Sequence, residues 1–351
     1  MTDRRAALDR TTDELDEALV LLHRMGPEYF GGLANHGPMA AEALHHLDRP
    51  DAVLPWTQRY VEQLEPAPGS GRPLTDDEWP EALGRPDRYP DWLVRFEREL
   101  AAAPWTQVVA WWAPVLVPGL WGGACHGAIR AAHAARALGE HESPARVAEL
   151  ARALAYWASV AEELPGDTRL AGPLALDDAL AGVAALPTPD TSGFLITERV
   201  AQLATVPELP AAIDRLGPVT LSELTAAAAR AYLANSSHAA IAFAHGVTGP
   251  AALRMLAPVV DGSTTATALG AAWRAVAVLL AAFGEHGTGA DLDLAGVDAT
   301  TDRDGLVDRA VANGDEHVIK LTAACLDEHA VAPDPAYLAA AADVPTRLGA
   351  R

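Results

Sequence analysis

The chain has 351 residues with 26 basic and 47 acidic side chains, which gives a net charge of −21 at pH 7, and half of its residues are hydrophobic. This length allows one large domain or two small ones, with ample apolar material for a buried core. The acidic balance argues against nucleic acid, whose binding requires a basic face, and against docking on anionic lipid.

No targeting or membrane segment is expected from the sequence. Residues 1–5 lead into an acidic stretch without the apolar segment of a signal peptide. No window approaches the 18 or so uncharged apolar residues of a membrane span. The two cysteines, Cys125 and Cys325, are too few for a disulfide framework. We therefore expect a cytoplasmic protein without a nucleic-acid or membrane partner.

Alanine-rich amphipathic segments recur along the chain. In the first of them, Leu15, Leu19 and Leu22 follow one another at helical spacing. The segments predicted as helices are, in chain order, 13–25, 38–47, 91–102, 127–138, 144–163, 222–245, 250–256, 265–283, 306–312, 316–329 and 335–342.

Strand signals are nearly absent, since no Asn-Gly or Asp-Gly pair lies between alternating β-branched runs. The chain also lacks the Gly-x-Gly-x-x-Gly and Gly-x-x-x-x-Gly-Lys patterns of nucleotide-binding loops and the Gly-x-Ser-x-Gly pattern of serine hydrolases. We predict an all-α fold, with a single large multi-helix domain over residues 1–351. The long connecting segment 66–90 is a candidate lid, because long loops inside a domain often cover binding sites.

Histidines that stand in four well-separated segments are the main functional signal. They are His36, His126, His245 and His317. One imidazole from each of several distant helices is the way that helical bundles assemble a metal centre. The competing interpretation is that these histidines are buried and only satisfy hydrogen bonds.

Two of the four histidines have a second histidine seven residues away, His133 for His126 and His238 for His245. Seven residues return to the same helix face with a rise of about 10.5 Å. Because a metal–imidazole bond is only about 2.1 Å long, one metal ion is not expected to take both members of a pair. The spacing alone leaves open which member is the ligand.

A single lysine, Lys320, accompanies 25 arginines and lies three residues after His317. A surface cation in this chain is normally arginine, so Lys320 suggests a role that arginine cannot fill. A desolvated neutral lysine reacts with CO2 to form a carbamate, which carries a negative charge and two oxygens and acts as a long carboxylate ligand. The alternative is a lysine that packs its stem along the helix and pairs with Glu316 or Asp327 in water.

Imidazole nitrogens combined with a hard oxygen ligand suit iron, with zinc, copper and nickel as competitors. We therefore predict a metal site formed by His36, His126, His245, His317 and Lys320, with Fe(II) as the expected metal.

Four motifs in order along the chain resemble the questin oxidase-like family. They are NHGPM at 35–39, GLWGGACHGAIR at 119–130, HGVTGPAALR at 245–254 and DEHVIK at 315–320. The motifs are spread in order over most of the chain, and their combination is specific although each alone is weak. The resemblance implies oxidative ring opening of aromatic polyketides such as anthraquinones in secondary metabolism. It also implies a flavin-free, iron-dependent dioxygenase chemistry with histidines and a carboxylated lysine around the metal.

The leading hypothesis is a non-haem iron oxygenase that uses O2 to cleave a ring C–C bond of a polycyclic aromatic substrate. His133 and His238 are then expected to orient ligands or to act as acid and base. Arg130 is expected to hold a substrate oxyanion.

Two alternatives remain open. One is a metal-free Baeyer–Villiger-type monooxygenase with NADPH as the reductant. The other is a helical binding or scaffold protein without catalysis.

Overall fold

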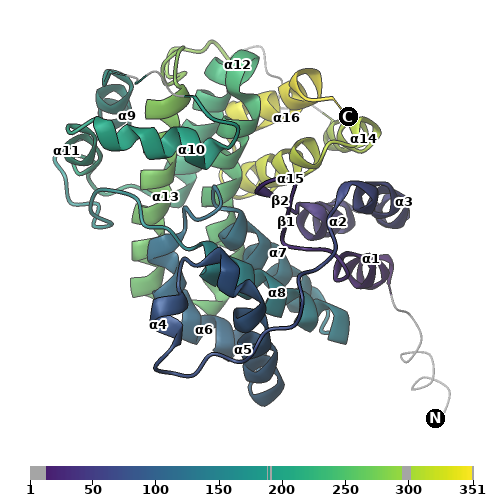
Figure 1. Cartoon of the computed structure of the whole chain (residues 1–351). Coiled ribbons are helices and arrows are strands. Elements are labelled where there is room, and N and C mark those ends of the chain that lie inside the picture. Colours follow the sequence, from purple (N-terminus) through teal and green to yellow (C-terminus); the bar gives the residue numbers. More distant parts are fainter. Residues whose placement is uncertain (1–12, 188, 190–191, 295–301, 350–351) are drawn as a thin grey trace.

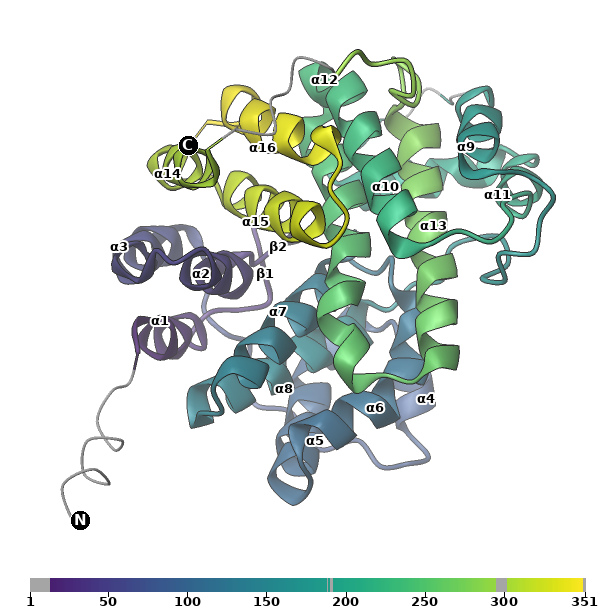
Figure 2. The same cartoon turned by 180° about the vertical axis from the view of Figure 1, so that it is seen from behind.

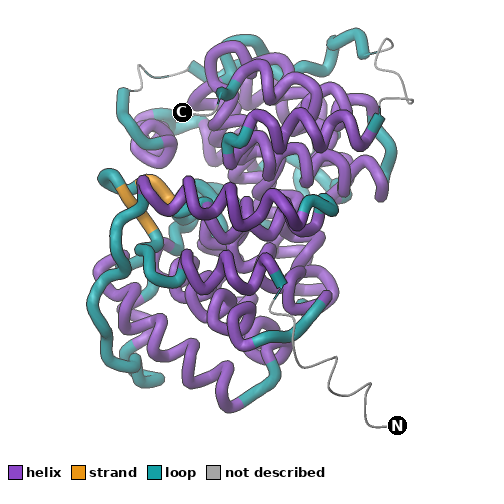
Figure 3. Tube along the Cα trace, turned by 90° about the vertical axis from the view of Figure 1, so that its right-hand side faces the viewer, coloured by secondary structure: helices purple, strands orange, loops and turns teal. Residues whose placement is uncertain are grey.

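A computed structural model describes residues 13–187, 189, 192–294 and 302–349. Within this described part, sixteen α-helices together with short 3-10 turns make 69% of the residues helical, and the only strands are β1 (Glu28–Tyr29) and β2 (Leu33–Ala34). The two strands form one antiparallel hairpin at one side of the helical body (Figure 3). The predicted all-α fold is confirmed.

The first eight helices are α1 (Glu14–Leu22), α2 (Gly37–His46), α3 (Pro50–Tyr60), α4 (Trp79–Ala82), α5 (Tyr89–Ala102), α6 (Trp105–Leu116), α7 (His126–Glu140) and α8 (Pro144–Val160). The remaining helices are α9 (Leu176–Ala184), α10 (Ile196–Ala201), α11 (Leu209–Ile213), α12 (Leu221–Leu256), α13 (Gly262–Phe283), α14 (Arg303–Asn313), α15 (Glu316–Val331) and α16 (Pro335–Arg347). Short 3-10 turns occupy Val61–Gln63, Pro86–Arg88, Val117–Gly119, Gln202–Thr205 and Ala257–Val259.

Helix α12 forms the centre of the packing. It contacts α7, α13, α15 and α16, and in Figures 1 and 2 it stands beside α13 with α15 and α16 against its upper half. Helices α1, α2 and α3 pack on one another, and of these α2 contacts α7 and α15 while α1 contacts α8. Helix α5 also packs on α8. One continuous cluster of buried side chains links these helices, so a site between α2, α7, α12 and α15 lies inside the core.

The expected break between helices 222–245 and 250–256 is wrong, because α12 continues through Pro250. The chain is instead interrupted at Ala239, whose φ of −138° and ψ of 35° are not helical. The sequence pattern does not predict helix α3 either, since Pro50 follows the preceding helix as a stop signal would. Pro50 takes the first position of α3, where proline is well tolerated because its missing N–H has no helical partner.

Helix α13 is long and apolar enough to cross a membrane by length and composition alone. This corrects the expectation that no segment approaches a membrane span. Its one charged residue, Arg274, is buried and donates to the carbonyl oxygens of Leu164 and Pro118, at 2.5 and 3.2 Å. The most apolar 18-residue stretch of α13 is 83% buried inside the protein, as expected for a core helix.

Close packing of α7 on α8 depends on Gly127. A Cβ atom at this position would lie 2.5 Å from Trp157 Cα, which real structures do not show. Gly139, near the end of the same helix, has no atom within 4 Å of the place that a Cβ would take. The two glycines therefore form a matched pair, one in a tight helix contact and one in open space.

Gly127→Ala is expected to destabilise the protein by about 1 to 3 kcal/mol through overpacking. Gly139→Ala is expected to stabilise it by about 0.5 to 1 kcal/mol, because alanine loses less backbone entropy in a helix. Chemical denaturation of both variants measures the free energy of unfolding. An equal effect of the two substitutions would contradict the packing described for α7 and α8.

Candidate metal centre

Four helices bring His36, His126, His245 and His317 together at the centre of the protein. The Nε2 atom of His126 lies 2.5 Å from Nε2 of His36 and 2.9 Å from Nε2 of His245. One ligand atom from each of His36, His245 and His317 lies within 4.8 Å of the others. All four side chains are buried, with at most 8% exposure. The structure thus brings these four predicted ligands to one point.

The position of each histidine follows from its local backbone. His36 occupies the position directly before α2, and its backbone N–H donates to the Tyr60 hydroxyl at 3.0 Å. His126 begins α7 directly after three left-handed residues, Gly123, Ala124 and Cys125, with φ of 58°, 55° and 68°. Non-glycine residues rarely adopt this conformation, and such strain is typical of functional sites.

His317 is placed by the start of α15. The side chain of Asp315 accepts from the backbone N–H groups of His317 and Val318, at 2.8 and 3.3 Å, and so caps the helix. Gly314 precedes it with a φ of 79°, which ends α14 in the left-handed conformation that glycine adopts easily. The Asn313-Gly314 pair therefore connects two helices rather than two strands.

Every one of the four imidazoles has an acceptor at its Nδ1 atom. The partners of His126 and His245 are the carbonyl oxygens of Gly123 and Ile241. Those of His36 and His317 are carboxylate oxygens of Glu316 and Asp315, at 3.2 and 3.3 Å. A neutral imidazole that donates from Nδ1 has its lone pair on Nε2. The Nε2 lone pairs of His36, His126 and His245 consequently face one another at close range.

Burial lowers the pKa values of His36, His126 and His245 well below the usual value, and the neighbouring histidines and Lys320 lower them further. These imidazoles are therefore neutral at physiological pH. Neutral imidazoles whose other nitrogen is held by a carbonyl or carboxylate are the normal form of histidine metal ligands.

Lys320 lies on α15 one turn after His317 and is 2% exposed. Its Nζ atom is buried and has no hydrogen-bond partner among the described residues. Burial lowers the pKa of the Lys320 ammonium to about 8, although Glu316 and Asp315 act to raise it. The alternative of a solvated lysine is therefore wrong, and Asp327 pairs with His46 and Arg136 instead. The four histidines and Lys320 fit a metal ion with one oxygen ligand. The buried Lys320 nitrogen has no other partner in the described part of the chain, and as a carbamate it would supply that oxygen.

A cavity of about 990 Å³ opens beside the four histidines, which all line its wall. Its aromatic lining consists of Tyr29, Trp56, Tyr60, Phe194 and Phe283. This volume is at the upper end of the range for small-molecule sites. The lining includes no residue of segment 66–90. This segment lies against α5, where Arg95 donates to the Leu74 carbonyl oxygen. The candidate lid therefore does not border the cavity. Residues 193–197 line its wall instead.

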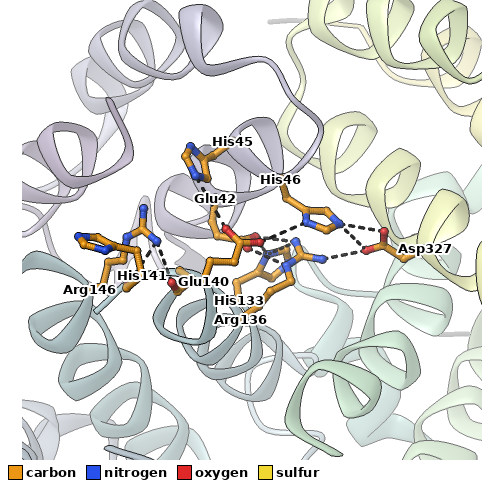
Figure 4. Close-up of polar contacts among 10 residues, drawn as sticks. Glu42, His45, His46, His133, Arg136, Glu140, His141, Arg146 and Asp327 are labelled. Atoms are coloured by element: carbon orange, nitrogen blue, oxygen red, sulfur yellow. Dashed lines mark hydrogen bonds and ion pairs between the residues drawn. The ribbon is translucent and has the colours of Figure 1, made fainter. Parts of the chain in front are cut away.

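His133 lies apart from the four histidines and does not line the cavity. Its Nδ1 atom is 2.5 Å from a carboxylate oxygen of Glu42, which also accepts two hydrogen bonds from Arg136. Figure 4 shows Arg136 joined to Glu42 on one side and to Asp327 on the other. Burial alone would raise the pKa of Glu42, but Arg136 and His133 outweigh it and hold the carboxylate charged.

Arg130 is buried and forms a two-bond ion pair with Glu149, at 2.6 and 3.0 Å. It borders a small separate void rather than the large cavity. The expected role of Arg130 in holding a substrate oxyanion does not fit this placement, because its guanidinium is already engaged.

His238 is exposed at the wall of the large cavity, and its Nε2 atom lies 2.8 Å from the carbonyl oxygen of Phe283. It does not join the four central histidines. The structure therefore distinguishes the members of each pair, with His126 and His245 at the centre and His133 and His238 outside it.

The sequence pattern alone does not mark Asp315, Glu316 and Tyr60 as parts of the site. Asp315 and Glu316 precede His317 directly, so their acidic pair was the available signal. Tyr60 comes from a helix that was not expected and had no signal. No family model and no curated protein matches this chain.

Lys320→Met is expected to stabilise the metal-free protein at pH 7 by roughly 1 to 3 kcal/mol, because it removes a buried charge without a partner. The pKa of this lysine is lowered in the folded state, so the cost is present below about pH 8 and disappears as the pH rises towards 10.5. Denaturation at pH 7 and pH 10 should therefore show a gain that shrinks at the higher pH. A loss of stability at pH 7 would contradict the burial of an unpaired ammonium.

Proposed function

We propose that the protein is a non-haem iron oxygenase that cleaves a ring C–C bond of a polycyclic aromatic substrate with O2. The observation that carries this proposal is the orientation of the imidazoles. Four buried histidines hold their Nδ1 atoms on fixed acceptors, and three Nε2 atoms lie within 2.9 Å of a neighbour. Without a cation between them, these lone pairs repel each other, so a metal ion relieves the strain.

The residues that would hold the ion are His36, His126, His245 and His317, with Lys320 as the source of an oxygen ligand. When bound, iron would supply Lewis acidity and the one-electron chemistry that O2 requires. The resemblance to the questin oxidase-like family supports the same assignment on the same residues.

Lys320 is proposed to act as a carbamate. Its neutral amine forms an N–C bond with CO2 and releases one proton, which yields a carbamate with a single negative charge. The lowered pKa of Lys320 favours the amine form that this reaction needs. The product would satisfy a position that is otherwise a buried, unpartnered nitrogen.

The cavity supports a flat aromatic substrate. Trp56 and Tyr60 stack in its wall, with ring centroids 4.7 Å apart and an interplanar angle of 15°. The Trp56 indole N–H donates to the Gly314 carbonyl at 2.8 Å, which fixes the ring beside the start of α15. A planar substrate lying on these rings would be held next to the histidines, which lowers the entropic cost of reaction.

Tyr60 and two carboxylates fix the histidines from behind. Burial raises the pKa of Tyr60 well above its usual value, so the phenol stays neutral and accepts from His36 N–H. Glu316 holds the Nδ1 side of His36 and Asp315 that of His317. These carboxylates orient the imidazoles, as carboxylates do behind metal-bound histidines.

His36→Ala, His126→Ala, His245→Ala and His317→Ala are each expected to lose most bound iron, since each removes one donor of a single centre. His141→Ala and His329→Ala are controls, because both histidines lie far along their helices from the centre. Elemental analysis of tag-free protein from iron-replete medium measures the metal content. Wild-type protein without bound iron, and without stabilisation by added Fe(II), would contradict the proposal.

Assays of ring opening and O2 consumption separate the alternatives. Ring-opening activity of metal-free protein with NADPH would favour the Baeyer–Villiger-type monooxygenase. A protein that binds an aromatic ligand but consumes no O2 would favour the scaffold interpretation.

Lys320→Arg is expected to abolish iron binding, because a guanidinium stays protonated and cannot form a carbamate. Lys320→Ala removes the ligand without placing a charge in the site, so a short carboxylate such as acetate should restore part of the binding. Fe(II) titrations with and without acetate compare the two variants. Iron binding by Lys320→Arg at the wild-type level would rule out the carbamate.

A further inference from the structure

Three potential metal donors meet at the surface, away from the four central histidines. His238, Glu285 and His286 each offer one ligand atom, and these atoms lie within 4.8 Å of one another. All three side chains are exposed, and the two imidazole rings stand edge to face with centroids 5.0 Å apart. Two imidazoles and one carboxylate are a common donor set for zinc, with water in the remaining position.

The ring of His238 is already oriented for ligation. Its Nε2 atom bonds the carbonyl oxygen of Phe283, at 2.8 Å, so the neutral imidazole donates there and keeps the lone pair of Nδ1. Metal-binding histidines commonly donate their other ring N–H to a backbone carbonyl in this way. This bond is an observation independent of the clustering of the three residues.

The loop that carries Glu285 and His286 is fixed to α12 by a buried side chain. Asn235 accepts from the His286 backbone N–H at 2.9 Å and donates to the carbonyl oxygens of Gly287 and Ala231, both at 2.9 Å. Asn235 lies three residues before His238 on the same helix, so one side chain sets the loop relative to the histidine. The backbone that carries two of the donors is therefore held in place before any ligand arrives.

The electrostatic surroundings favour a cation. Helix α13 ends at Phe283, and the first half of α12 ends where the chain leaves helical geometry at Ala239. The partial negative charge of two helix C-termini is thus directed at the same place. The net charge of −21 adds a long-range attraction for cations.

We propose that His238, Glu285 and His286 form a second metal site, for Zn²⁺ or a similar divalent transition metal, at the wall of the large cavity. His238 belongs to that wall, so an ion bound there stands beside the substrate space rather than within the central histidines. The proposal does not depend on the chemistry assigned to the central site.

The test is Zn²⁺ binding by the tag-free full-length chain, measured by equilibrium dialysis and calorimetry. His238→Ala and His286→Ala are each expected to weaken binding at one site by about tenfold or more, and Glu285→Gln is expected to weaken it in the same direction. Both alanine variants should fold, because Asn235 holds the backbone of His286 and water can replace His238 at Phe283. His141→Ala, an exposed histidine elsewhere, is the control and should bind as wild type does.

His245→Ala separates this site from the central one. If both sites bind Zn²⁺, the wild-type chain binds two equivalents. His245→Ala then loses the equivalent at the central site, and His238→Ala loses the one at the second site. If the central site binds no metal, the wild-type chain binds one equivalent, which His238→Ala removes and His245→Ala leaves. Zn²⁺ binding that is the same in wild type, His238→Ala and His286→Ala would overturn the second site.

Discussion

The close approach of unprotonated imidazole nitrogens in a buried space is the constraint on which the rest of the structure depends. Gly123, Ile241 and two carboxylates each hold an Nδ1 atom, so the Nε2 lone pairs are directed inward. Burial also keeps His36, His126 and His245 neutral. Such an arrangement is unfavourable by itself and would become favourable with a cation between the nitrogens, which is why we propose a metal ion at this point of the fold.

The helical frame supplies the rigidity that this arrangement needs. Helix α12 contacts α7 and α15, and α2 contacts both of these helices in turn. Small residues allow the helices to approach closely, as at Gly127 against Trp157 and at Gly249, where a Cβ would lie 3.2 Å from Cys125 Sγ. The left-handed segment before His126 and the buried, unpartnered Lys320 are local costs within this frame, and functional sites commonly contain such costs.

The sequence predicted the helical class and the four histidines that converge, because helix periodicity and separated His-containing segments are local signals. It did not predict the partners of those histidines. Arg130 meets Glu149 through helix packing that no local pattern encodes. A seven-residue spacing puts His238 on the same helix face as His245 only if the helix is regular. The helical geometry is interrupted at Ala239, between the two histidines. The cavity wall at 193–197 likewise carries no helix or strand signal that would mark it as functional.

Anomalous diffraction at the iron edge, from crystals of the Fe(II)-loaded protein, tests the central claim most directly. The account predicts one peak between the four imidazoles, about 2.1 Å from their Nε2 atoms, with electron density that extends from Lys320 Nζ towards it. A peak elsewhere, or iron-soaked crystals in which the four imidazoles surround no anomalous scatterer, would contradict it.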